Sequence, residues 1–156
     1  MNPPELLIAQ LLPHVGRMLL LDELLEHNDE VITAALTIRS DSVLCDGVTG
    51  VPAWVGMEYM AQTACAFSGV DEVRAGQRPS ISALLGTRSY RAHVPVFALG
   101  TRLTITAQLL MRDDDNLGVF ACTIRDAATQ AELAVGDIKA IRPANIHALI
   151  EEQLRG

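Results

Sequence analysis

Apolar and polar residues alternate with a period of two in several stretches of the chain. The clearest is 101–112, where Leu103, Ile105 and Ala107 share one face and polar side chains take the other. Because successive side chains of a strand point to opposite faces, this alternation predicts strands with one buried face. By the same reasoning, strands are predicted at residues 18–26, 30–39, 80–91, 101–112, 117–125 and 131–142. Polar runs between them predict turns at residues 27–29, 113–116 and 126–129.

One long segment, residues 52–68, is apolar nearly all round, and Gly69 predicts its end. A helix of this kind is normally surrounded by protein, and in a small domain a sheet that curls around it provides that environment. Short helices are predicted at residues 5–12 and 146–154. We therefore expect an α+β protein with one domain, 1–156, in which an antiparallel sheet of about six strands wraps a long buried helix, with short terminal helices.

Composition excludes several classes of function. The 156 residues are 49% hydrophobic, and the net charge of -7 disfavours nucleic acid as the principal partner because phosphate binding needs an excess of cations. We expect a cytoplasmic protein with no membrane partner, since no apolar run is long enough for a span and the N-terminus lacks a basic leader. Three cysteines without paired spacing, and the absence of phosphate-binding or zinc motifs, predict no metal and no cofactor.

Two polar side chains, Glu58 and Gln62, interrupt the apolar helix. They stand four positions apart, so they lie on the same face one turn from each other. Burying an unpaired carboxylate costs several kcal/mol, so a carboxylate in such a helix needs partners or a task. Glu58 either pairs with an arginine or caps a loop, or it transfers protons with Gln62 orienting it. We expect Glu58 to be substantially buried beside an apolar pocket.

Two motifs resemble those of the hot-dog 3-hydroxyacyl-[acyl-carrier-protein] dehydratases of the FabZ and FabA type. Pro13-His14 followed by Met-Leu-Leu-Leu-Asp at 18–22 is similar to the N-terminal Pro-His-Arg segment of that family. Val51-Pro52-Ala53, with Glu-Tyr-Met-Ala-Gln at 58–62, is similar to its helix motif and most similar to the ApeP-like branch of aryl-polyene and related polyketide or fatty-acid pathways. The resemblance implies a helix wrapped by a sheet that continues across a dimer.

The resemblance also implies a reaction, the dehydration of a 3-hydroxyacyl thioester. In that family a histidine in the loop before the helix removes the α-proton, and the helix carboxylate of the other subunit assists departure of the hydroxyl. Backbone N–H groups at the helix start polarise the thioester carbonyl. Carried onto this sequence, the carboxylate is Glu58, and the substrate-binding positions are Pro52, Ala53 and Trp54.

The family histidine is missing. Fourteen positions before Glu58 stands Leu44, and the loop 44–50 contains no histidine. Asp46 and His93 are the candidate replacements, although a carboxylate facing Glu58 would repel it. Cys45 is interpreted as a packed thiol, and the remaining histidines are interpreted as structural: His14, His27 and His147.

Three functions remain open at this point. The chain is a dehydratase whose histidine comes from a paralogous subunit, a hot-dog acyl thioesterase that uses Glu58 as general base, or a non-catalytic hot-dog partner. The expected substrate carrier is an acyl carrier protein or coenzyme A, and the expected assembly is a homodimer or a heterodimer. Four arginines that either steer an acidic carrier or only aid solubility are Arg74, Arg78, Arg88 and Arg91.

Overall fold

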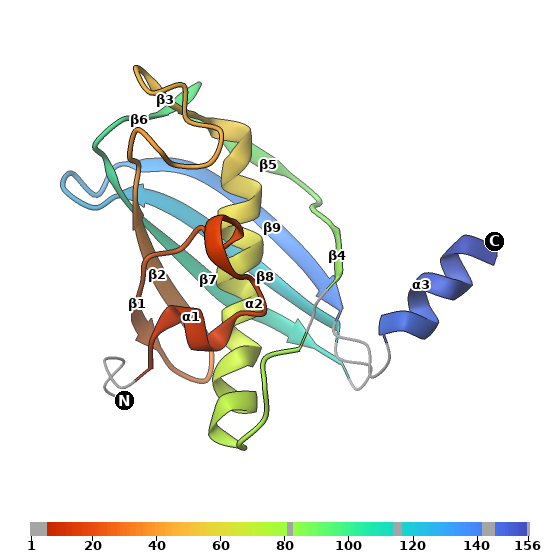
Figure 1. Ribbon diagram of the computed structural model, residues 1–156. Coiled ribbons are helices and arrows are strands. Elements are labelled where there is room, and N and C mark those ends of the chain that lie inside the picture. Colours follow the sequence, from red (N-terminus) through yellow and green to blue (C-terminus); the bar gives the residue numbers. More distant parts are fainter. Residues whose placement is uncertain (1–5, 81–82, 114–116, 142–145, 156) are drawn as a thin grey trace.

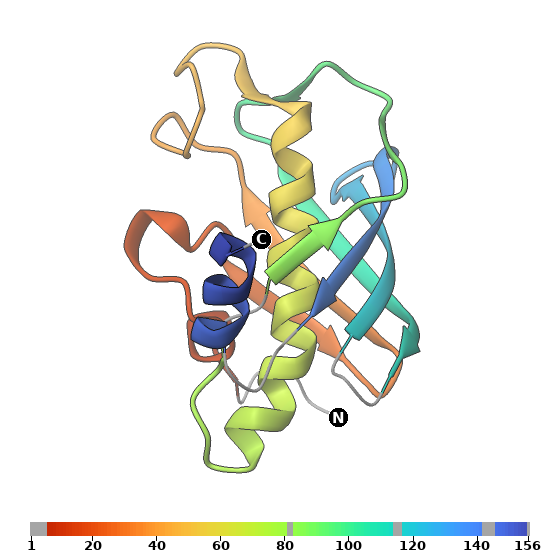
Figure 2. The same cartoon turned by 90° about the vertical axis from the view of Figure 1, so that its right-hand side faces the viewer.

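A curved antiparallel sheet packs along one long helix in the computed structural model, which describes residues 6–80, 83–113, 117–141 and 146–155 (Figures 1 and 2). In the described residues the sheet has seven strands. Its order begins with β1 (Glu23–His27), β2 (Val31–Thr37), β7 (Arg102–Arg112), β8 (Leu117–Asp126) and β9 (Glu132–Ile141), and β9 then pairs with both β4 (Ala83–Gly86) and β5 (Tyr90–Ala92). A separate two-stranded sheet joins β3 (Gly50–Pro52) to β6 (Val96–Ala98).

The sheet forms its core face from the alternation seen in the sequence. In β7 the side chains of Leu103, Ile105 and Ala107 are fully buried, whereas the polar residues between them are not. Antiparallel pairing sets Leu36 of β2 opposite Leu103 and therefore adds a second buried row. The predicted strands at 30–39, 101–112, 117–125 and 131–142 are confirmed within two residues at each end.

The long helix begins later and ends later than predicted. A 3₁₀ turn, η3 (Ala53–Val55), leads into α2 (Gly56–Arg74), which packs against β2, β7, β8 and β9. Gly69 lies inside α2 rather than at its end. A Cβ built on Gly69 would lie 2.0 Å from the backbone oxygen of Leu11, so the glycine permits the close approach of α1 (Ile8–Leu11).

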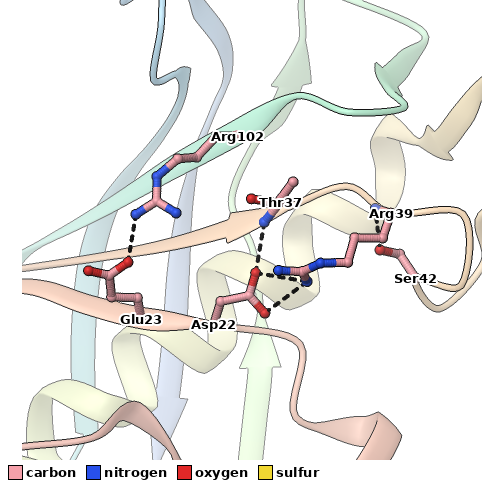
Figure 3. Close-up of polar contacts among 6 residues, drawn as sticks. All are labelled: Asp22, Glu23, Thr37, Arg39, Ser42 and Arg102. Carbon is pink, nitrogen blue, oxygen red and sulfur yellow. Dashed lines mark hydrogen bonds and ion pairs between the residues drawn. The ribbon is translucent and has the colours of Figure 1, made fainter.

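The predicted strand at 18–26 is wrong in its first half. Residues 16–18 form a 3₁₀ turn, η2 (Gly16–Met18), and the sheet is joined only from Glu23. The apolar residues before Glu23 lie against α2, because the backbone of Met18 and Leu20 forms hydrogen bonds with the side chain of Gln62. At its end, Asp22 accepts the N–H of Thr37 at 2.8 Å and pairs with Arg39 at 3.1 Å (Figure 3).

Other predictions differ in detail. The single strand at 80–91 is two short strands, β4 and β5, with 81–82 outside the described residues. The strands β3 and β6 were not predicted, and the turn predicted at 113–116 falls largely outside the described residues. The short C-terminal helix is confirmed as α3 (Ile146–Arg155). Within the described part of the chain, no helix has the length and apolar character needed to cross a membrane.

Candidate active site

The carboxylate of Glu58 lies in the first turn of α2 and meets Gln62 one turn further along. Gln62 Nε2 donates to Glu58 Oε1 at 3.1 Å, which confirms that the two side chains share a face. The Gln62 side chain is buried, whereas Glu58 is 42% exposed in this chain. The expected substantial burial of Glu58 is therefore wrong for the single chain.

Gln62 has little capacity left for a ligand. Its Nε2 also donates to the backbone oxygen of Met18 at 2.8 Å, and its Oε1 accepts the N–H of Leu20 at 3.0 Å. One buried amide thus ties the N-terminal segment to the helix and orients Glu58 at the same time. Gln62, predicted to orient Glu58 in proton transfer, does bond to that carboxylate and also holds the N-terminal segment.

His14 is the histidine that the structure brings to Glu58. Its Nε2 lies 3.9 Å from Glu58 Oε1, and its Nδ1 is buried without a hydrogen-bond partner among the described residues. The interpretation of His14 as structural therefore missed a neighbour of the carboxylate. The sequence did carry a signal, because one of the two family-like motifs contains His14 and the other contains Glu58. The residues that follow His14 include Met18, to which Gln62 donates.

A small cavity of about 90 Å³ opens beside these groups. Its volume corresponds to roughly three water molecules, which is enough for the reacting carbons of a small acyl group. It is lined by His14, Glu58, Ala61, Gln62, Cys65, Leu84 and Ala140. The lining therefore combines the polar side chains of His14, Glu58 and Gln62 with mostly apolar ones, which is the usual composition of a small-molecule site.

Asp46, proposed as a substitute for the family histidine, accepts hydrogen bonds from residues of its own loop. Its Oδ1 accepts the N–H groups of Val48, Thr49 and Gly50 at 2.9, 2.7 and 3.0 Å, and its Oδ2 accepts the Thr49 hydroxyl. These bonds, the Thr49 hydroxyl foremost, hold the pKa of Asp46 well below its usual range. Asp46 does not line the cavity of Glu58.

The other candidate, His93, is not brought to Glu58 in this chain. Its Nε2 lies 2.9 Å from Glu132 Oε2 on an exposed part of the surface. Leu44, at the position of the family histidine, is 54% exposed and has a φ of 65°. That left-handed conformation is uncommon for a residue other than glycine, asparagine or aspartate.

The start of the helix also differs from the expectation. The N–H of Ala53 donates to the backbone oxygen of Pro95 at 3.0 Å, so it is not free to polarise a thioester. The carbonyl of Ala53 accepts the hydroxyl of Tyr90, and burial raises the pKa of Tyr90 to about 12. Ala53 joins the helix start to β5 and the β5–β6 connection, and the proposed donor role for its amide is wrong.

The remaining substrate-binding candidates lie next to Ala53. Pro52 ends β3 and pairs with Val96, and Trp54 is 58% exposed at the helix start. Neither lines the cavity. In the described residues, no cluster of three or more histidine, cysteine or acidic side chains could hold a metal ion.

Comparison with known proteins identifies relatives of the whole chain. The family model described as ApeP-like, ApeP dehydratase, matches residues 6–151. The dehydratase heterocomplex ApeI:P from Xenorhabdus doucetiae contains a chain that is 31% identical, with a TM-score of 0.82, over 94% of this chain and 96% of that one. No curated protein sequence matches.

More distant solved structures share the fold alone. The E. coli PaaI protein of the phenylacetic acid degradation operon is 17% identical, with a TM-score of 0.55, over 76% of this chain and 81% of that one. A hypothetical thioesterase from Streptococcus pneumoniae with coenzyme A is 13% identical, also at 0.55, over 77% and 84%. With the closer match, these structures confirm the predicted α+β hot-dog architecture.

Proposed function

The chain belongs to the ApeP-like family of hot-dog dehydratases, and we propose that it dehydrates 3-hydroxyacyl thioesters as one subunit of a two-chain hot-dog assembly. The observation that carries this proposal is the geometry of Glu58. Gln62 holds one carboxylate oxygen from a buried helix position, and a cavity opens at the same place. A fixed carboxylate beside a small, mostly apolar cavity is suited to proton transfer on a bound acyl group.

The reaction needs one base and one acid on the same acyl group. A base removes the C2 proton, and the electron pair forms the C2=C3 bond. The C3–O bond breaks while protonated Glu58 gives its proton to the departing hydroxyl, which leaves as water. The products are the trans-2-enoyl thioester and water, and the base keeps the proton from C2 until it passes to solvent or back to Glu58.

We assign the base to a histidine of a second hot-dog subunit. The loop position of the family histidine is Leu44, and Asp46 is occupied by its own loop. Glu58 is 42% exposed, so one side of the carboxylate is open to a neighbouring chain. The similar structure from Xenorhabdus is described as a heterocomplex of two proteins, which supports the same arrangement here.

The acyl group arrives on a carrier, and we propose an acyl carrier protein in the cytoplasm, within an aryl-polyene or related polyketide or fatty-acid pathway. Arg88 precedes β5, Arg91 lies within it, and both are exposed, although the whole chain carries a net charge of -7. A local positive surface attracts an acidic carrier protein and mainly increases the rate of association. Coenzyme A thioesters are the small-molecule equivalent.

The test follows enoyl product and free thiol at the same time. The purified chain is given a 3-hydroxyacyl carrier-protein thioester, first alone and then with a histidine-bearing hot-dog dehydratase subunit. We expect weak dehydration alone and a large increase with the second subunit. Thiol release without enoyl product in either arm would support the thioesterase alternative, and full dehydration by the chain alone would contradict the requirement for a partner.

Assembly is tested separately by sedimentation. A sheet with unpaired edge strands is a liability for a single chain, and pairing across a two-fold axis relieves it. In the described residues β1 lies at one edge of the sheet order and β4 at the other. We expect at least a dimer at micromolar concentration, so a species of one chain only would contradict the proposed assembly.

A further inference from the structure

We infer that His14 is a second positioning residue for Glu58, so that Gln62 and His14 together hold Oε1 and leave Oε2 for the substrate. The inference rests on the proposed function, because it assigns a role within that site. Both donors approach the same oxygen, Gln62 Nε2 at 3.1 Å and His14 Nε2 at 3.9 Å. Among the described residues no hydrogen bond is made by Oε2.

The buried side of the imidazole determines which nitrogen carries the proton. His14 Nδ1 is buried and has no hydrogen-bond partner in the described part of the chain. An N–H group buried without an acceptor is costly, whereas an N–H aimed at a carboxylate forms a charge-assisted bond. The favoured tautomer therefore carries its proton on Nε2, which faces Glu58.

The separation of 3.9 Å between His14 Nε2 and Glu58 Oε1 is longer than a hydrogen bond. Catalytic hydrogen bonds are often long in a free enzyme and shorten when substrate closes the site. Both side chains line the 90 Å³ cavity, so an acyl group there contacts them together. Occupation of the cavity is expected to bring Nε2 and Oε1 into hydrogen-bond contact.

The chain on both sides of His14 is anchored to α2. Before it, Leu11 packs so closely on Gly69 that a Cβ there would lie 2.0 Å from the Leu11 oxygen. After it, the Met18 oxygen accepts from Gln62 at 2.8 Å. Pro13, directly before His14, further restricts the backbone. His14 thus lies on a short connection with two fixed ends, which a positioning role requires.

Two substitutions separate hydrogen bonding from packing. His14→Phe keeps a ring but removes the donor, and His14→Gln removes the ring but keeps an N–H donor at about the reach of the imidazole Nε2. For dehydration of a 3-hydroxyacyl carrier-protein thioester by the chain with its histidine-bearing subunit, we expect kcat to fall roughly 10- to 100-fold in His14→Phe and much less in His14→Gln. KM is expected to stay within about twofold, because the lost interaction acts in the transition state.

His93→Phe is the matched comparison, since it removes a histidine that also pairs with a glutamate, Glu132, outside the cavity. Its kcat is expected to stay within about twofold of wild type. Equal losses in His14→Phe and His93→Phe, or no rescue by His14→Gln, would overturn the inference while the proposed function stands. Absence of enoyl product from wild type in every arm would instead refute the proposed function.

A spectroscopic measurement then decides the inference without activity. Long-range proton–nitrogen correlation in the full chain identifies the tautomer of each histidine. We expect His14 to carry its proton on Nε2 and its signals to shift in Glu58→Ala, with little change at His93. A His14 proton on Nδ1, or signals unaffected by Glu58→Ala, would overturn the role whatever the kinetics show.

Discussion

Two acidic side chains close in sequence, Asp46 and Glu58, have opposite surroundings. Asp46 lies in an exposed loop, where three backbone N–H groups and one hydroxyl from the next four residues surround it. Glu58 lies on a helix with one oxygen held by Gln62 and the other without a hydrogen bond among the described residues. Glu58 lines the cavity of about 90 Å³, and Asp46 does not.

The difference shows that a carboxylate can bind a ligand only through an oxygen that the surrounding protein does not already hydrogen-bond. Asp46 organises its loop and keeps a low pKa, so it is a poor proton donor at neutral pH. Glu58 is held by one oxygen, and in the proposed reaction the other oxygen exchanges a proton with the substrate.

The largest expected effect tests this difference directly. Glu58→Gln keeps the volume of the side chain but removes the ionisable group, so dehydration by the two-subunit assembly is expected to fall by ~100- to 10,000-fold. Asp46→Asn is the matched substitution and is expected to change the rate by no more than a few-fold. Enoyl formation, measured for both at equal subunit ratios, checks the contrast. Equal losses would mean that Asp46 also takes part in the reaction.

Removing the anchor of Glu58 is expected to affect stability as well as rate. Gln62→Leu leaves the N–H of Leu20 without its acceptor in a partly buried place, which costs about 2 kcal/mol in the free energy of unfolding. Gln108→Leu, an exposed position on β7, is the control and should stay within about 0.5 kcal/mol. Urea unfolding measures both, and equal values would show that Gln62 does not hold the N-terminal segment.

Much of this fold could be predicted from periodicity, because its core lies between one face of the sheet and the long helix. Strands such as β7 alternate buried side chains with more accessible ones, and most of α2 is apolar because much of its length is buried. The same reasoning failed for residues 18–20. They were predicted as strand, but the carbonyl of Met18 and the N–H of Leu20 bond to the Gln62 side chain, and bonding to β2 begins only at Asp22, whose N–H donates to Ala35. A side-chain amide that replaces a strand partner leaves no periodic signal.

Part of the candidate site could also be predicted from regular spacing along the chain. Glu58 and Gln62 stand on one helix, so helical spacing is sufficient to bring them together. His14 reaches Glu58 only through tertiary packing across more than forty residues, which no local pattern encodes. Gly69 was predicted as a helix end because glycine often ends helices, whereas its role is the contact with Leu11.

His27 extends the comparison to a buried base, and its effect on stability is expected to be smaller. Neither ring nitrogen makes a hydrogen bond of good geometry among the described residues. Burial foremost, and then Arg74, lowers the pKa of His27 against the opposing effects of Asp71, Asp29 and the backbone of Phe67. The unfolded chain therefore binds a proton at His27 more readily, so stability falls as pH drops below the ordinary histidine pKa of about 6.5. Urea unfolding at pH 5 and 7.5 measures this, and His27→Phe should reduce the difference. An unchanged difference would assign it to other groups.

The smallest expected effect is local to the Asp46 loop. Because the pKa of Asp46 is lowered, its bonds persist above the ordinary aspartate value of 3.8 and are lost only as pH falls through the lower folded value. The amide signals of Val48 and Gly50 should therefore stay constant from pH 7 to about 4. Thr49→Val removes the hydroxyl and should bring the change to higher pH, whereas a wild-type transition above pH 4 would contradict the assignment.

The bonds of Gln62 also have a consequence for the order of folding. They join α2 to residues 42 and 44 positions earlier in the chain, and the contact of His14 with Glu58 spans a similar distance. Contacts of large sequence separation form late, after the entropy of closing a long loop has been lost. The helix can therefore form, with Gln62 already beside Glu58, before the N-terminal segment docks and brings His14 to the carboxylate. An intermediate that lacks this docking would have native helical signal but no contact between His14 and Glu58.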